Sequence, residues 1–102
     1  MNFNQLMKQA QLMQKKVNTI NKAYEEKEKE FESQNGLIKG IVTGKMEIKN
    51  LTIDPELLSI DNKEILEDML TVTLNEAVKN MYAEKEEALD KASGGIGMAG
   101  LF

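Results

Sequence analysis

Hydrophobic positions between Asn4 and about Lys27 follow the period of an α-helix. Apolar side chains recur at alternating intervals of four and three residues, at Leu6, Ala10, Met13, Val17, Ile20 and Tyr24. This heptad spacing keeps one apolar stripe aligned along a helix, and these six positions are referred to below as the seam. The next two positions in register are Lys27 and Phe31, so the pattern breaks at Lys27. The period alone leaves open whether helix continues over residues 25–32 or a first strand begins there.

A β-hairpin is predicted in the middle of the chain. Two β-rich runs, over residues 37–43 and 46–53, are separated by Gly44-Lys45. A two-residue loop that begins with Gly predicts a type II′ turn, with Thr43-Gly44 in a type I′ turn as the alternative. Asp54-Pro55 ends the second run, because Pro cannot donate to a strand ladder and the pair suits the start of a helical turn.

A second long helix is predicted from about residue 62 to residue 91. Asp61 followed three residues later by Glu64 is typical of a capping box. Apolar residues then recur at helical spacing and form a broad face for burial, at Leu66, Met69, Leu70, Leu74, Ala77, Val78, Met81, Ala88 and Leu89. Gly94 can end this helix. We therefore expect a single domain over residues 1–92 and a flexible, Gly-rich tail over residues 93–102. The alternative for the tail is that Leu101 and Phe102 dock on an apolar groove.

Two such helices are too long for one small sheet to cover. A helix of two dozen residues is about 35 Å long, whereas strands of seven or eight residues reach only about 25 Å. An uncovered apolar seam is rare on a soluble monomer, and an identical copy is the commonest cover. The pattern thus predicts a homodimer, intertwined or side by side. The alternative is that the two helices of one chain simply pack on each other.

The charges are distributed unevenly along the chain. The net charge is -4, yet residues 1–22 contain no acid and four lysines, Lys8, Lys15, Lys16 and Lys22. A basic helix on an acidic body can approach a phosphate backbone locally, so these lysines are candidate contacts to double-stranded DNA. The alternative is that they form the solvated face of an amphipathic helix. The chain has no Arg, which excludes bidentate Arg–guanine recognition and favours binding with low sequence specificity.

Catalytic and metal chemistry has little to rest on. The chain has no Cys, so cysteine nucleophiles and thiolate metal sites are excluded. It also has no His, so the commonest general base and the commonest metal ligand are both missing. We expect no enzyme activity, no cofactor, no metal site and no small-molecule substrate. No apolar run has the length of a signal peptide or a membrane span, so a cytoplasmic protein without a membrane partner is expected.

The sequence resembles the YbaB/EbfC family of bacterial nucleoid-associated proteins over essentially the whole chain. The resemblance rests on several short segments in register: the run from Leu6 to Gln14, Gly36-Leu37-Ile38-Lys39, Thr43-Gly44, Ile53-Asp54-Pro55-Glu56-Leu57-Leu58, Leu66-Glu67-Asp68, Asn75-Glu76-Ala77 and the Gly-rich end. Two departures stand out. Gly40 stands inside a strand where the family often has Val or Thr, and Lys replaces Arg throughout.

The resemblance implies an α+β fold in the order α-β-β-β-α, with a small antiparallel sheet, two long helices and a first strand over residues 28–34. It also implies a homodimer shaped like tweezers that binds duplex DNA with limited sequence preference and acts in the nucleoid on DNA conformation and gene expression. Lys8 and Lys16 match the family's pattern, whereas Lys15 and Lys22 rest on the charge argument alone. The alternative function is a helical protein-interaction adaptor for the replication or recombination machinery, with no direct DNA contact.

Overall fold

The computed structural model describes residues 2–92 and has the predicted order of elements. Along the chain these elements are α1 (Phe3–Glu25), β1 (Glu28–Glu32), β2 (Ile38–Thr43), β3 (Ile48–Ile53), the 3₁₀ turns η1 (Pro55–Leu58) and η2 (Ile60–Asn62), and α2 (Lys63–Ala92). The predicted α+β class is confirmed. The question left open over residues 25–32 is also answered, because α1 ends before β1 begins. The predicted tail over residues 93–102 lies outside the described residues.

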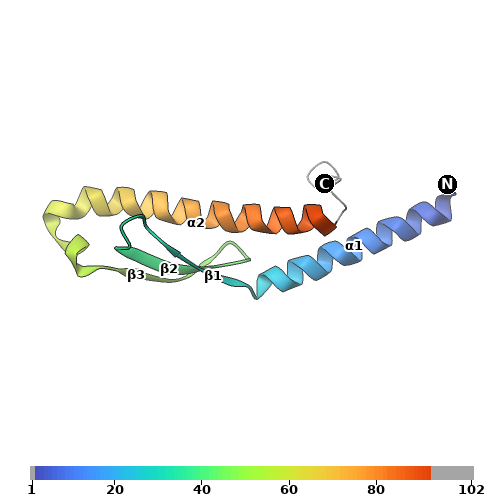
Figure 1. The fold of residues 1–102 in the computed structure, drawn as a ribbon, viewed down its shortest axis with the longest axis horizontal. Helices are drawn as coiled ribbons and strands as arrows, with labels where there is room; N and C mark the ends of the chain where they lie inside the picture. The colour runs from blue at the N-terminus through green and yellow to red at the C-terminus, as the bar shows by residue number, and fades with distance from the viewer. Residues whose placement is uncertain (1, 93–102) are drawn as a thin grey trace.

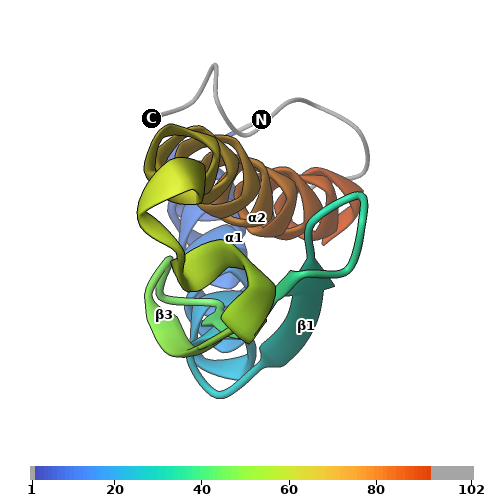
Figure 2. The same ribbon diagram turned by 90° about the vertical axis from the view of Figure 1, so that its left-hand side faces the viewer.

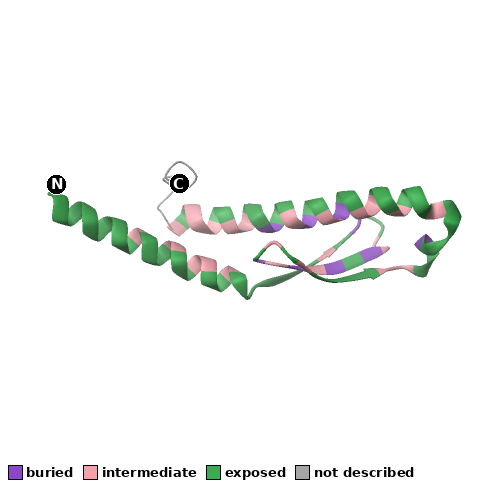
Figure 3. Cartoon of the chain, turned by 180° about the vertical axis from the view of Figure 1, so that it is seen from behind, coloured by how far each residue is buried: buried purple, intermediate pink, exposed green. Residues whose placement is uncertain are grey.

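Helix α2 covers one face of the antiparallel sheet, whose strand order is β1-β2-β3 (Figures 1 and 2). The central strand alternates, so that Ile38 and Val42 are buried while Lys39 between them is exposed. Val42 packs with Ala77 and Met81 of α2 into the core of the molecule. Figure 3 shows this buried surface concentrated between the sheet and the middle of α2.

The β2–β3 turn differs from both predicted types. Types I′ and II′ need a positive φ at Gly44, but Met46 has the positive φ in this loop, at 64°. The Met46 N–H donates to the Thr43 carbonyl at 2.9 Å and the Thr43 N–H donates to the Glu47 carbonyl at 2.9 Å. This is the three-residue loop in which a left-handed residue follows a tight turn. Gly44 is required here because the backbone of Tyr24, at the end of α1, leaves no room for a side chain.

Gly40 does not interrupt its strand. It pairs with Phe31 on one side and Leu51 on the other. A Cβ at this position would lie 2.4 Å from the Asn50 carbonyl oxygen and 2.6 Å from the Phe31 ring, so backbone and ring already occupy the space of a side chain. The bulge lies one residue further on, where the register shifts between Ile41 and Val42.

The connection into α2 confirms one predicted cap and corrects another. The Asp54 carboxylate accepts a hydrogen bond from the Glu56 N–H at 2.9 Å, and Pro55 opens η1 as predicted. Asp61, in contrast, does not cap α2, because it lies inside η2, which leads directly into the long helix. The chain already turns helically before Lys63, so a capping box has no free helix end to close.

The chain is elongated and covers little of its own apolar surface. It measures 68 × 22 × 15 Å with a radius of gyration of 19.1 Å, against about 13 Å for a compact domain of this length. Large apolar side chains are exposed along the sheet edge, the η turns and α2, at Leu51, Leu58, Ile60, Ile65, Val72 and Tyr82. A surface of this kind is typical of a protein that has a partner.

Candidate nucleic-acid interface

The first half of α1 projects beyond the rest of the molecule (Figures 1 and 3). Asn2 caps this helix, its side-chain oxygen accepting a hydrogen bond from the Gln5 N–H at 2.9 Å. Every residue from 2 to 12 is exposed, and no residue of α1 is fully buried. The helix therefore presents its outer half to solvent on all sides.

The predicted seam is divided along its length. Met13, Val17, Ile20 and Tyr24 are half-buried where α1 runs beside α2. Leu6 is 53% exposed, and Ala10 is exposed as well. Packing between the two helices of one chain thus accounts for the second half of the seam and leaves the first half uncovered.

Three of the candidate lysines form one row on α1. Lys8, Lys15 and Lys22 follow one another at intervals of seven residues, which is about 20° short of two helical turns and about 10 Å along the axis. This row, called the lysine stripe below, lies on the side of α1 opposite the seam. All three side chains are exposed, and the ion pairs found within residues 2–92 use other lysines.

Lys16 lies off the stripe, about 100° around the helix from Lys15. A groove at the end of α2 brings Lys15 and Lys16 together with Thr19, Ile20 and Ala92. A second groove, on the projecting part of α1, is lined by Lys8, Gln11, Leu12 and Lys15. The structure thus places Lys8, Lys15 and Lys16 on connected surface, whereas Lys22 borders neither groove.

A junction between α1 and α2 was not found from the sequence. The Glu84 carboxylate of α2 forms ion pairs with Lys27, which follows α1, and with Lys29 of β1, the latter at 3.2 Å. The Tyr24 hydroxyl donates to the Glu84 carbonyl at 3.4 Å, and the Lys27 ammonium lies 4.8 Å from the centre of the Tyr24 ring. We call these four residues the clasp. The one sequence signal was the break in the heptad pattern at Lys27.

Gly44 completes the clasp from the β2–β3 loop. Its N–H donates to the Lys27 carbonyl at 3.0 Å, and a Cβ would lie 1.7 Å from the Tyr24 carbonyl oxygen. Only glycine allows this approach, because the obstacle is backbone and cannot rotate away.

Gly44→Ala is expected to lower the free energy of unfolding by about 1–3 kcal/mol, the usual cost of overpacking. Urea denaturation at fixed protein concentration measures the change. The neighbouring exposed substitution Lys45→Ala serves as control and should leave stability within about 0.5 kcal/mol of the original value. A Gly44→Ala chain as stable as that control would contradict the close approach.

The ion pairs of the clasp also shift two pKa values. Hydrogen bonds from Lys27 and Lys29 hold the pKa of the Glu84 carboxyl below its ordinary 4.5, and the Glu84 hydrogen bond raises the pKa of Lys27 above 10.5. The ion pairs of Glu84 therefore contribute stability at a pH above the ordinary pKa of a glutamate, and this contribution is lost as the pH falls through the lowered pKa. The ion pair of Lys27 contributes stability at a pH below the ordinary pKa of a lysine, and this contribution is lost as the pH rises through the raised pKa.

A ¹³C titration of the Glu84 side-chain carboxyl should accordingly give a midpoint below its ordinary 4.5. Replacing both Lys27 and Lys29 with Gln should raise this midpoint. A Glu84 midpoint that is the same with and without the two lysines would show that the ion pairs do not form in solution.

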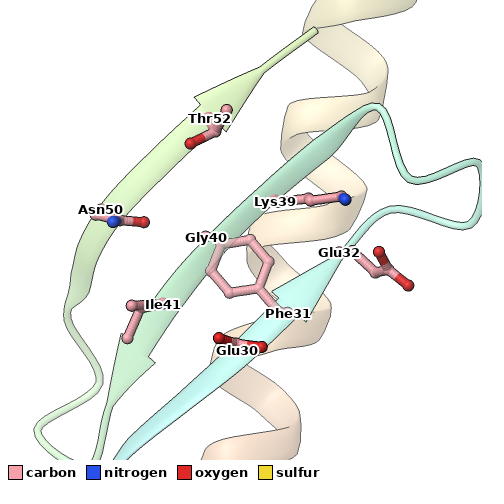
Figure 4. Close-up of a pocket in the computed structure, with 8 residues that line it drawn as sticks. All are labelled: Glu30, Phe31, Glu32, Lys39, Gly40, Ile41, Asn50 and Thr52. Carbon is pink, nitrogen blue, oxygen red and sulfur yellow. The ribbon is translucent and has the colours of Figure 1, made fainter.

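The outer face of the sheet holds a separate shallow pocket (Figure 4). It is lined by residues of all three strands, Glu30, Phe31, Glu32, Lys39, Gly40, Ile41, Asn50 and Thr52. Two carboxylates beside a single lysine give it no preference for phosphate. The pocket therefore adds nothing to the lysine stripe.

In the part of the chain that the structure describes, His, Cys, Asp and Glu side chains do not gather in groups of three or more that could hold a metal ion. Among residues 2–92, no helix combines the length and the apolar character needed to cross a membrane.

Fold and surface together define a small α+β protein that projects a basic helix from an acidic body. The chain belongs to the YbaB/EbfC DNA-binding family, whose sequence model matches residues 1–96. It is 40% identical to a nucleoid-associated protein of Acinetobacter baumannii, with 100% of both chains covered. It is 42% identical to one from a Psychrobacter species, over 100% of this chain and 99% of the other.

A third relative, a nucleoid-associated protein of Clostridium novyi, is 35% identical over 100% of this chain and 90% of its own. The crystal structure of an uncharacterised protein from Helicobacter pylori shares the fold. Its TM-score is 0.73 at 24% identity, over 85% of this chain and 91% of that one.

Proposed function

We propose that this protein is a nucleoid-associated protein that binds double-stranded DNA as a homodimer with low sequence specificity. The observation that carries the proposal is the lysine stripe, an exposed row of cations on a helix that projects from the body. Membership of a DNA-binding family and the names of three relatives support it. The location that follows is the nucleoid.

The stripe suits a phosphate backbone in length and charge. From Lys8 to Lys22 it extends about 21 Å, a distance over which duplex DNA carries about twelve phosphates. Residues 2–22 contain no carboxylate that would repel the DNA phosphates. The last acid of α2, Asp90, lies two residues before Ala92, which shares a groove with Lys15 and Lys16. Lys8 lies further out on the projecting half of α1, and screening over about 8 Å limits the effect of the α2 acids there.

A homodimer is supported by the apolar surface that one chain leaves uncovered. The exposed residues follow the β3 edge and α2, and they include Leu51 at 41% and Val72 at 56%. A second copy that covers them would present two lysine stripes on one particle. Two projecting helices contact more phosphates than one, and the affinity rises accordingly.

Low specificity is supported by the side chains available at the tip. Lysine and glutamine contact phosphates and position a protein, but the Arg forks that read guanine are missing from the whole chain. The protein is thus expected to recognise the backbone rather than a base sequence. A role in DNA conformation, nucleoid organisation and gene expression would follow from such binding at many sites.

Fluorescence anisotropy with three unrelated duplexes of equal length tests this function. We expect binding to each, with dissociation constants within about tenfold of one another, since backbone contacts are shared by all sequences. Light scattering on the same sample should give twice the 11.5 kDa chain mass. Absence of binding to every duplex would reject the proposal in favour of a protein-interaction adaptor, and a monomer at micromolar concentration would reject the dimer.

A further inference from the structure

We propose that Glu84 is a positioning residue, which fixes the direction of α1 and thereby the placement of the lysine stripe against DNA. The proposal rests on the proposed function, and it assigns a role in that function to a residue of α2 that lies outside the stripe. It follows from how α1 is attached to the body.

Helix α1 is attached through its second half, which runs beside α2, and through the connection to β1. Glu26 and Lys27 form the short connection to β1. The seam residues beyond it are only half-buried, and the outer half of the helix is fully exposed. Packing alone therefore leaves the direction of α1 weakly determined, because an exposed half-helix has no neighbour that opposes its rotation.

The clasp supplies the missing restraint at this connection. Glu84 holds Lys27 and Lys29 with its two carboxylate oxygens and the Tyr24 hydroxyl with its backbone carbonyl. Three segments, the end of α1, the connection and β1, are thus tied to one residue of α2. Isolated ion pairs on a surface hold geometry weakly, but here the glutamate side chain is only 29% exposed and its contacts act together.

The length of α1 amplifies any change at the clasp. Lys8 lies sixteen residues from Tyr24, about 24 Å along the helix. A rotation of about 10° at the connection would therefore displace Lys8 by about 4 Å, more than the length of a hydrogen bond. In the proposed dimer, the two α1 helices must contact one duplex at the same time. Their spacing depends on this angle, and simultaneous binding is lost when the spacing is wrong.

Glu84→Gln separates positioning from charge. Removal of a carboxylate makes the protein less negative, so electrostatics alone would strengthen DNA binding. Loss of the clasp would weaken it. Glu76→Gln is the matched control, since Glu76 is an exposed glutamate on the same helix outside the clasp and its loss changes the charge equally. We expect Glu84→Gln to bind duplex DNA about fivefold or more weakly than Glu76→Gln.

The direction of α1 is measured without DNA. The chain has no Cys, so spin labels can be attached at Gln9→Cys on α1 and Asn80→Cys on α2. Labelled chains are refolded with a tenfold excess of unlabelled chains, so that only distances within one chain contribute. Pulsed electron resonance should give a narrow distance distribution for the unaltered and Glu76→Gln proteins, and a clearly broader one for Glu84→Gln.

The double variant Lys27→Gln with Lys29→Gln provides a second route if Glu84→Gln fails to fold. It removes the clasp from the other side and should broaden the distribution in the same way. Narrow distributions in the variants would overturn the proposal, as would a broad distribution with DNA affinity equal to that of Glu76→Gln. If the unaltered protein binds no DNA, the proposed function fails, and the positioning role fails with it even where the clasp itself is confirmed by the distances.

Discussion

Reversing the charge of the lysine stripe is expected to reduce the affinity for duplex DNA by about 100-fold or more at 0.1 M salt. The triple variant Lys8→Glu, Lys15→Glu and Lys22→Glu would replace the three proposed phosphate contacts with three repulsions on each α1 helix. The stripe side chains are exposed, so the fold should survive with an unchanged circular dichroism spectrum. Fluorescence anisotropy with a random duplex measures the loss.

A matched control keeps this experiment specific to the stripe. Lys39, Lys45 and Lys79 are exposed lysines on the body, away from the projecting half of α1. Their reversal to Glu changes the net charge equally and should weaken binding by less than about tenfold, through the general field alone. Equal losses in the two triple variants would show that total charge governs binding and that α1 is not the contact. Lys16→Glu alone, being off the stripe, should have a smaller effect than the stripe variant.

Met81→Ala is expected to cost about 2–5 kcal/mol of stability, the usual range for truncating a buried Met. Met81 is 0% exposed and packs with Val42 and Ala77 between α2 and the sheet. Within residues 2–92 few other apolar residues are buried that could compensate. We expect the variant to be largely unfolded at 37 °C, as measured by circular dichroism.

Its control is Asn80→Ala, at the exposed neighbouring position on the same helix. This substitution should change stability by no more than about 0.5 kcal/mol. A Met81→Ala protein as stable as the control would mean that the contact between α2 and the sheet is not the core of the fold.

The sequence predicted the elements whose signals are local. The pattern located the start of α1 and both ends of α2 to within a residue or two, because long amphipathic helices repeat their pattern many times, but it left open where α1 ends. Strand β1 was different: its sequence, Glu28 to Glu32, has a single apolar residue, Phe31, and period could not separate strand from helix. At this segment the family resemblance predicted a strand, and the structure confirmed the strand.

The errors arose where a local signal had a distant cause. Gly44 was interpreted as a turn glycine with positive φ, but it is needed because the Tyr24 backbone lies against it. Glycine tolerates both situations, so its presence alone does not distinguish them. Met46 takes the left-handed conformation instead.

The candidate lysines follow from the charge asymmetry of the sequence, but the geometry around them does not. The seven-residue spacing of the stripe was readable from the sequence, whereas the exposure of the first half of α1 depends on where α2 ends. The clasp could not be predicted from the sequence, because Lys27 and Glu84 are 57 positions apart. Among five other glutamates on α2, the sequence gives no reason to select Glu84.

The most direct test of the account is the salt dependence of DNA binding by the unaltered protein. If the stripe neutralises phosphates, the logarithm of the association constant should fall linearly with the logarithm of the salt concentration. Four to eight contacts per dimer predict a slope of about -4 to -7, reduced to about -2 or less in magnitude for the stripe variant, which removes six lysines per dimer. A slope near zero for the unaltered protein, or the same slope in both proteins, would contradict the assignment of the lysine stripe as the DNA contact.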